Sequence, residues 1–177
     1  MSRIRNKPES NSDSAEIARV LLRLAIGGTM IAHGVRHGRT LSGTARWFES
    51  IGFRHPRLQA QLSTAVEIGS GAAVAAGAAT PLSTSAVVGT MGVAYRTVHR
   101  PNGYFVIKDG GEYVAVVAAA AVALSALGSG ASSVDRLLGA HEIGGPARRA
   151  LLTLGLGLAG AAAQLRGFWN DPAGEQP

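Results

Sequence analysis

Cysteine is absent from the 177 residues, and charged residues make up only 16% of them, against roughly 25% in an average soluble domain. Without cysteine, disulfide frameworks, zinc–thiolate sites, iron–sulfur ligation and thiol redox chemistry are excluded within this chain. Aromatic residues are also few, at 5%, whereas apolar residues reach 46%. This composition argues against a disordered tail protein and against an ordinary soluble enzyme. The length suits one domain, or at most two very small ones.

The common signatures of soluble enzymes are missing as well. The chain has no P-loop, no dinucleotide fingerprint and no HExxH or GxSxG motif. Its glycine-containing stretches GVRHG and GSGAA are apolar sequence rather than phosphate-binding loops. Chemistry that depends on a soluble cofactor therefore has no recognisable site here.

Positive charge is present in excess, with a formal net charge of +6. Such an excess is typical of nucleic-acid binding, of contact with anionic lipid, or of the flanks of membrane spans. The arginines lie between long uncharged runs. Residues 58–95 carry one charge, Glu67, and residues 113–134 carry none. A hydrocarbon core of about 30 Å needs about 20 helical residues, so these runs are long enough to be membrane spans.

The first of these runs is about twice the length of a span and is interrupted near its middle. The interruption is Thr80-Pro81-Leu82-Ser83-Thr84-Ser85, and proline with hydroxyl residues is a turn and helix-start signal. We therefore expect a helical hairpin. The alternative is a buried helix pair in a soluble protein, but too little polar sequence remains to coat such a pair.

These patterns predict an all-α fold, a polytopic membrane bundle of four core transmembrane helices with a probable fifth at the C-terminal side. Residues 1–12 are expected to be a disordered basic tail, residues 13–134 the bundle, and residues 135–177 a linker with a possible fifth span and a polar tail. The fifth segment, ALLTLGLGLAGAAAQL, is short and glycine-rich, so an interfacial helix stays open for it. The expected spans are residues 16–36, 60–79, 83–99, 112–131 and, as the fifth, 150–165.

The first expected span carries charge near its start. Asp13 is placed to cap the helix, with Glu16 as the capping-box partner three residues on. Arg19 and Arg23 would lie at the membrane edge, where arginine extends toward the headgroups. A signal peptide fits poorly, because arginine lies inside the apolar part. Positive charge is almost evenly divided between the two sides of the membrane, so charge alone does not set the orientation. We place the N-terminus on the cytoplasmic side because the first span often dominates orientation.

Ionisable residues within the spans are few and therefore informative. A charge near the bilayer centre costs about 2.5–3.5 kcal/mol on insertion scales, so it is usually paired or lines a cavity. Arg23 and Glu67 are expected at similar depth, where they would pair or flank a common pocket. Two interpretations stay open: a quinone or proton site, or a structural arginine–glutamate pair that holds helices together.

Three histidines are expected near the membrane surface. His33 and His37 share one helix face, and His99 ends the third span. They suit a metal or haem site, a pocket in which histidine exchanges protons, or ordinary headgroup-level positions. No carboxylate third ligand accompanies the two spaced histidines, so we predict no metal site.

Two connecting segments have their own patterns. Residues 44–56, TARWFESIGFRHP, predict an amphipathic helix that lies at the membrane interface with its aromatic rings among headgroups. Interleaved basic and aromatic residues also occur in single-strand nucleic-acid binding, but the flanking spans argue against nucleic acid. Residues 100–113 begin with the turn signal Pro-Asn-Gly. This loop, with Asn102, Glu112 and Tyr113, either closes a pocket or simply connects two spans.

Four segments in order resemble the DoxX family of small four-span membrane proteins. They are VLLRLAIGGTMIAHGVRH, GTARWFESIGF, AVEIGSGAAVAAGAATPLS and HRPNGYFVIKDGGEYVAVV, which together cover residues 16–131. Residues beyond about 135 are additional to the usual four-span core, and Arg36-His37 stands where the family often has a lysine further on. The resemblance carries the following positions over to this chain: Arg23, His33, Gly34, Glu67, His99, Asn102, Gly103, Glu112 and Tyr113.

The resemblance implies a multi-pass protein of the bacterial cell (inner) membrane. Members of this family are similar to the membrane subunit of a thiosulfate:quinone oxidoreductase, to partners of oxidative-stress enzymes, or to assembly factors. We therefore expect an accessory or quinone-linked component of a membrane redox system, with quinone as the one candidate cofactor. The alternative is a non-catalytic scaffold that binds a partner protein, or a second copy of itself, through small-residue helix faces. The pocket candidates are Arg23, His33, Glu67, His99, Asn102, Glu112 and Tyr113.

Overall fold

The computed structural model describes residues 8–140 and 143–172, and the described residues form helices, turns and loops without a β-strand. The predicted all-α fold is therefore confirmed for this part of the chain. Three short turns follow α4: a π-helical turn, η1, and two 3₁₀ turns, η2 and η3. The elements are α1 (Pro8–Arg39), α2 (Leu41–Ser50), α3 (Pro56–Ala76), α4 (Thr80–Ala94), η1 (Tyr95–His99), η2 (Arg100–Asn102), η3 (Val106–Lys108), α5 (Glu112–Leu127), α6 (Val134–Leu137) and α7 (Pro146–Phe168).

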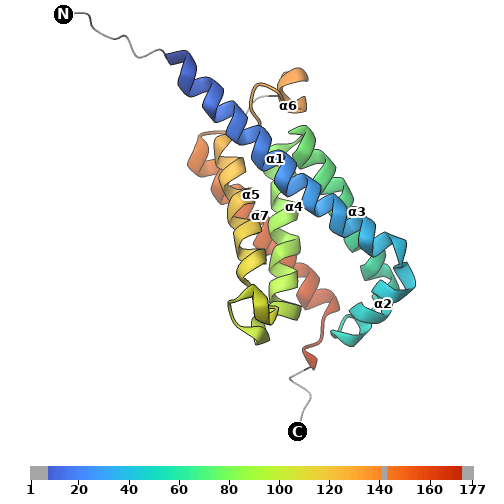
Figure 1. The fold of residues 1–177 in the computed structure, drawn as a ribbon. Coiled ribbons are helices and arrows are strands. Elements are labelled where there is room, and N and C mark those ends of the chain that lie inside the picture. The colour runs from blue at the N-terminus through green and yellow to red at the C-terminus, as the bar shows by residue number, and fades with distance from the viewer. Residues whose placement is uncertain (1–7, 141–142, 173–177) are drawn as a thin grey trace, which may run out of the picture.

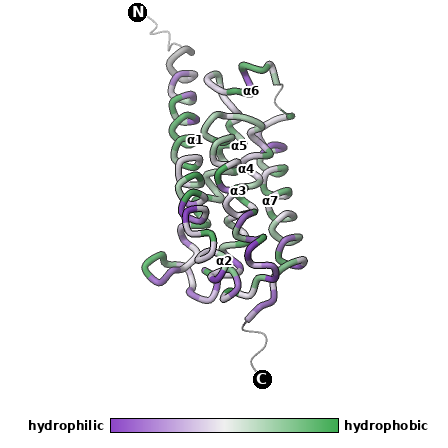
Figure 2. The backbone as a smooth tube through the Cα atoms, turned by 90° about the vertical axis from the view of Figure 1, so that its right-hand side faces the viewer, coloured by the Kyte–Doolittle hydropathy of each residue, from purple (hydrophilic) through white to green (hydrophobic). Residues whose placement is uncertain are grey.

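The long helices run along one axis and pack in two groups (Figure 1). Helix α1 packs chiefly against α3, whereas α4 packs against α7 and α5 and joins the two groups through α3. The first residues of α1 lie at the same end of the bundle as α6, and α7 finishes at the opposite end, near α2 (Figure 1). Hydrophilic residues gather at that second end, around α2 and the last turns of α7 (Figure 2).

Helix α1 begins earlier than its charge pattern suggests. It starts at Pro8, so residues 8–12 are helical rather than part of a disordered tail, and the first seven residues lie outside the described part. Asp13 is therefore inside the helix and is not its cap. Glu16, its expected capping-box partner, instead accepts hydrogen bonds from the backbone N–H groups of Ala131 and Ser132, at 3.0 and 2.8 Å.

The predicted hairpin is present between α3 and α4. Helix α3 ends at Gly77, which has a φ of 67°, a left-handed conformation that glycine adopts without strain. The Thr80–Ser85 segment is the first turn of α4 rather than the connecting loop. Asp135, from the loop after α5, caps this turn by accepting hydrogen bonds from the N–H groups of Ala79 (2.7 Å) and Thr80 (3.0 Å).

Glycines allow helix backbones to approach closely at two interfaces. A Cβ added at Gly27 of α1 would lie 2.5 Å from the carbonyl oxygen of Gly71 on α3. On the other side of the bundle, a Cβ on Gly157 of α7 would lie 2.7 Å from Val88 of α4. Small residues therefore replace side-chain interdigitation at the tightest crossings, as is common where helices associate without a hydrophobic driving force.

The distribution of polarity differs from that in a typical soluble bundle. Large apolar side chains along the helices face outward: Leu82 is 66% exposed, Leu151 70% and Val116 60%. Polar side chains are buried beside an apolar core, including hydroxyls that link three helices: Thr153 of α7 bonds both Thr84 of α4 (3.1 Å) and Ser125 of α5 (2.7 Å). The helices thus bury many polar groups and present large apolar side chains outside.

Helix α7 is longer than the 150–165 segment, with 23 residues. Within the described residues it is the one helix that is long and apolar enough to cross a membrane by itself, judged by length and composition, and α5 is apolar but shorter. Arg149, which directly precedes the 150–165 segment, is buried and its guanidinium donates to the carbonyl oxygens of Ser125, Ala126 and Gly144. It therefore closes the C-terminal end of α5.

Helix α2 confirms the predicted amphipathic helix but not the placement of all its aromatic rings. Phe48 and Phe53 are 5% and 4% exposed and pack together with Ala60, Val93 and Ala161. Only Trp47 is substantially exposed, at 41%. The two phenylalanines therefore dock α2 onto the bundle, and the expectation that they lie among headgroups is wrong.

Candidate functional site

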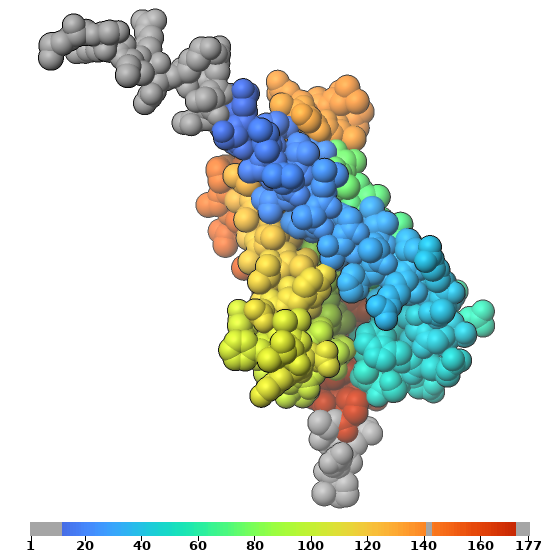
Figure 3. Space-filling model, viewed as in Figure 1, coloured from blue at the N-terminus to red at the C-terminus, as the bar shows by residue number. Residues whose placement is uncertain are grey.

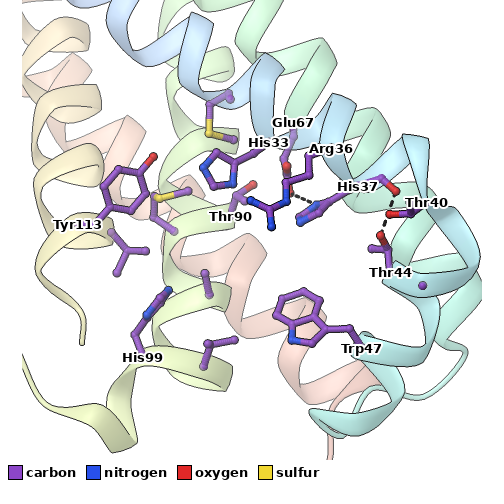
Figure 4. A pocket seen from close by; sticks show the side chains of 16 residues that line it. His33, Arg36, His37, Thr40, Thr44, Trp47, Glu67, Thr90, His99 and Tyr113 are labelled. Atoms are coloured by element: carbon purple, nitrogen blue, oxygen red, sulfur yellow. Dashed lines mark hydrogen bonds and ion pairs between the residues drawn. The ribbon is translucent and has the colours of Figure 1, made fainter. Parts of the chain in front are cut away.

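A cavity of about 540 Å³ opens between α1, α2, α3, α4 and α5. Its mouth is the hollow between α2 and the loop that joins α4 to α5 (Figure 3). Apolar side chains contribute to the lining, and a set of polar and aromatic side chains faces inward from α1, α2, α3, α4, η1 and α5 (Figure 4). The polar and aromatic lining residues are His33, Arg36, His37, Thr40, Thr44, Trp47, Glu67, Thr90, His99 and Tyr113.

Glu67 is the buried charge of this cavity. It lies on α3 and is 4% exposed. Ser63, one turn earlier, donates a hydrogen bond of 2.6 Å to Glu67 Oε1, and His37 Nδ1 lies 3.2 Å from the same oxygen. The other oxygen, Oε2, is buried and has no hydrogen-bond partner among the described residues. An unsatisfied buried acceptor is unfavourable, so this atom is available to a hydrogen-bond donor that enters the cavity.

Aromatic and imidazole rings line the cavity in a row. The rings of Tyr113 and His33 are stacked with centroids 6.2 Å apart, and His33 meets His37 edge-on at 6.5 Å. His37 in turn lies 6.1 Å from Trp47. These four rings come from α5, α1 and α2, so they supply flat apolar faces beside the carboxylate.

His99 approaches the cavity from the opposite side, at the end of η1 (Figure 4). Its Nδ1 lies 2.6 Å from the carbonyl oxygen of Asp109. A carbonyl oxygen only accepts hydrogen bonds, so Nδ1 carries the hydrogen and Nε2 of the neutral ring is an acceptor. The π-helical turn that places His99 is a rare backbone feature that occurs mostly at functional sites.

The structure brings four of the seven predicted pocket residues together: His33, Glu67, His99 and Tyr113 all line the cavity. Asn102 and Glu112 are not among its lining residues. Asn102 donates to the carbonyl oxygens of Val98 and Asp109, and Glu112 accepts from the backbone N–H of Val106. These two residues shape the loop beside the cavity mouth.

Arg23 is not part of the cavity, and the predicted Arg23–Glu67 pair is wrong. Arg23 is buried, at 6% exposure, but it donates two hydrogen bonds to the carbonyl oxygen of Ala75, at 2.8 and 3.1 Å. It also donates to the carbonyl oxygens of Ser129 and Ser132. It therefore caps the C-terminal end of α3, while Glu67 lies more than two turns away along that helix and binds Ser63 and His37 instead.

Four contributors to the site were not among the pocket candidates predicted from the sequence, although His37 was considered there as a pocket histidine. His37 shares a helix face with His33, but its contact with Glu67 depends on how α1 crosses α3. Arg36, Thr90 and Trp47 line the cavity as well. Thr90 lies on α4 and Trp47 on α2, and the sequence alone does not show which face of these two helices points into the bundle. The helical spacing HGVRH is the one signal that pointed toward this cluster.

Metal binding has no structural support at this site. In residues 8–140 and 143–172, no three His, Cys, Asp or Glu side chains are close enough together to hold a metal ion. The cavity instead combines an unpaired carboxylate oxygen, imidazoles and aromatic faces. This donor set suits an organic molecule with both polar and apolar parts.

The fold and the cavity define a helical-bundle protein with outward-facing apolar side chains and one polar pocket between its helices. The family model DoxX matches residues 18–100. This match confirms the DoxX resemblance predicted from the sequence and supports a membrane-associated protein. No curated protein matches the chain, and no solved structure does.

Proposed function

We propose that this chain is a multi-span protein of the bacterial inner membrane, with α1, α3, α4 and α5 as four core spans and α7 as the fifth. The outward apolar side chains and inward polar groups support this arrangement. Helix α4 continues without interruption into η1, so the segment 80–99 has the roughly 20 residues that a span needs. Only 12 residues lie between Arg23 and Arg36, too few for a span, so a span in α1 would include Arg23, whose guanidinium binds inward to the carbonyl oxygen of Ala75.

Within that bundle, we propose that the cavity around Glu67 binds a small amphipathic molecule of the quinone class. The observation that carries this proposal is Glu67, which lines a cavity of about 540 Å³ and whose Oε2 is buried without a hydrogen-bond partner among the described residues. A quinol hydroxyl is a donor that would satisfy it, and the row of rings offers flat faces to an aromatic headgroup. The cavity volume falls in the usual range for small-molecule sites.

A bound quinone would supply two-electron chemistry coupled to two protons. The chain's own residues would hold and move the protons. Glu67 Oε1 and His37 Nδ1 lie 3.2 Å apart, close enough for a proton to pass between them. His99 presents Nε2 as an acceptor from the opposite side. Because the sequence has no cysteine and no cofactor motif, electrons would come from a partner protein, so the proposed role is an accessory one.

The test replaces the carboxylate with an amide of equal size. Glu67→Gln keeps an acceptor for Ser63 but puts an amide NH₂, which cannot accept, where the carboxylate oxygen would receive the quinol hydroxyl. We therefore expect the quinone retained by protein purified under reducing conditions, where it is in the quinol form, to fall at least tenfold. Glu49→Gln, on the exposed face of α2, is the matched control and should retain quinone like the wild type. Equal quinone in Glu67→Gln and wild type, or none in the wild type, would contradict the proposal.

The alternative function, a scaffold that binds a partner through small-residue helix faces, has less structural support. Among the glycines of α3 and its end, Gly71 and Gly77 are buried against other parts of this chain, and Gly69 is the exposed one, with no neighbour within 4 Å of an added Cβ. On that alternative, Glu67→Gln would change only stability, and the purified protein would carry a partner chain rather than quinone. The same purification therefore separates the two functions.

A further inference from the structure

A second cavity, of about 460 Å³, lies on the other side of the contact between α4 and α5, where these helices face α7. We propose that it binds an anionic phospholipid of the surrounding bilayer, with the headgroup at Arg100 and one acyl chain along the groove. The proposal rests on the membrane placement proposed above, but not on what occupies the first cavity.

The charge at the cavity mouth selects for an anion. Arg100 is the single charged side chain that lines this cavity, and no carboxylate does. Tyr95 and Tyr104 also line this cavity and are 47% and 59% exposed. A guanidinium with two tyrosines is typical of the headgroup level of membrane proteins, where basic pockets between helices bind anionic headgroups.

The walls of the cavity suit an acyl chain. They consist of small and aliphatic residues: Val88 on α4, Ala115 and Ala118 on α5, and Leu154 and Leu158 on α7. From Gly111 to Ala118 the groove follows α5 for seven residues, which is about 10 Å at 1.5 Å per residue. Leu154 and Leu158 are 41% and 51% exposed, so the groove is open along its side, as entry from a bilayer requires.

The loop at the mouth is built around glycines that admit Tyr95. Gly103 has a φ of 78°, and a Cβ on Gly111 would lie 2.7 Å from the Tyr95 ring. Tyr95 is the first residue of η1, the π-helical turn that places His99 at the first cavity, and Arg100 directly follows it. The side chains of this turn therefore line both cavities: His99 the first, and Tyr95 and Arg100 the second.

Native mass spectrometry of the full-length, detergent-purified protein tests the proposal directly. The probe is an equimolar mixture of dioleoyl phosphatidylglycerol and dioleoyl phosphatidylcholine. We expect the wild type to retain the anionic lipid at least fivefold over the zwitterionic one. Arg100→Gln should lower this ratio to about one, because the exposed side chain contributes to headgroup binding and not to the core. Lys108→Gln, an exposed cation outside the cavity, should leave the ratio unchanged.

A second variant and a competitor separate this site from a general anion site. Ala118→Trp should fill the groove and reduce retention of both lipids, whereas excess inorganic phosphate should not displace phosphatidylglycerol. Displacement by phosphate, an unchanged ratio in Arg100→Gln, or an equal loss in Lys108→Gln would overturn the proposal. Glu67→Gln should leave lipid retention intact, so failure of the quinone site and failure of the lipid site give different results.

Discussion

Two buried arginines close the carbonyl ends of helices in this bundle. Arg23 binds the carbonyl oxygen of Ala75 near the end of α3, and Arg149 binds those of Ser125 and Ala126 near the end of α5. A guanidinium carries five donors and stays charged, so it satisfies several terminal carbonyls at once and complements the negative end of the helix dipole. In both cases the arginine joins helices that are far apart in sequence.

Removing the guanidinium of Arg23 should destabilise the fold. Arg23→Gln leaves at least two carbonyl oxygens without a charged donor, and hydrogen bonds to charged groups contribute about 1.5–3 kcal/mol each. We expect a lower midpoint of thermal unfolding in detergent, with quinone retention preserved in the folded fraction. Arg136→Gln, exposed in the neighbouring loop, is the control. A loss of quinone binding without loss of stability would place Arg23 in the site instead.

Sequence reasoning at the residue scale identified which polar groups turn inward but not what they bind. Arg23 and Glu67 are both buried, as their cost in an apolar environment requires. Their partners could not be derived, because Arg23 bonds backbone carbonyls, which every residue carries. His37 reaches Glu67 only because Gly34 and Gly38 let α1 lie close to α3.

At the scale of elements, the α1–α3 interface offers a matched pair of adjacent glycines. A Cβ at Gly27 would lie within 3 Å of backbone and side-chain atoms of α3, whereas a Cβ at Gly28 has no neighbour within 4 Å. Gly27→Ala should therefore lower stability by about 1–3 kcal/mol through overpacking. Gly28→Ala should be neutral or stabilising by up to about 1 kcal/mol, because alanine favours helix. The test compares the free energy of unfolding of the two variants in the same detergent. Equal changes in stability for Gly27→Ala and Gly28→Ala would argue against close packing at Gly27.

The start of α4 depends on a cap from a distant loop. Asp135 accepts from the N–H groups of Ala79 and Thr80 and from the Thr80 hydroxyl. Asp135→Ala should cost about 0.5–2 kcal/mol, whereas Asp135→Asn should lose less because its one amide oxygen replaces one of the two carboxylate acceptors. Limited proteolysis of residues 128–140 is the measurement, with the fastest cleavage expected in the alanine variant. No difference between the two variants would contradict a capping role.

Helix positions were largely predictable, because uncharged runs and the Thr80-Pro81 signal mark where helices lie and break. The ends of the helices were harder to predict. Helix α1 begins before its apolar part. Helix α7 extends beyond residues 150–165 at both ends, and at its start this is because Pro146 begins the helix and Arg149 turns inward. The burial of Phe48 and Phe53 depends on the docking of α2, which local amphipathicity does not specify.

At the scale of the whole molecule, polarity is arranged for an apolar surrounding. Outward leucines and valines surround inward hydroxyls, arginines and Glu67, and charged residues collect at the two ends of the bundle. Such an arrangement is unfavourable in water and favourable in a bilayer. Residues of the α4–α5 loop or its flanking turns line both cavities, so in the proposed membrane placement both would open near the same membrane surface.

Single-cysteine labelling in intact membrane vesicles tests the five-span arrangement most directly, since the natural chain contains no cysteine. Ala140→Cys and Ser42→Cys lie at opposite ends of the bundle, and Ala25→Cys and Ala159→Cys are exposed positions along the helices. An impermeant maleimide should label the first two from opposite sides of the membrane. The other two should react only after detergent is added. Labelling of both ends from one side, or free labelling of Ala25→Cys and Ala159→Cys in intact vesicles, would contradict the membrane-spanning bundle.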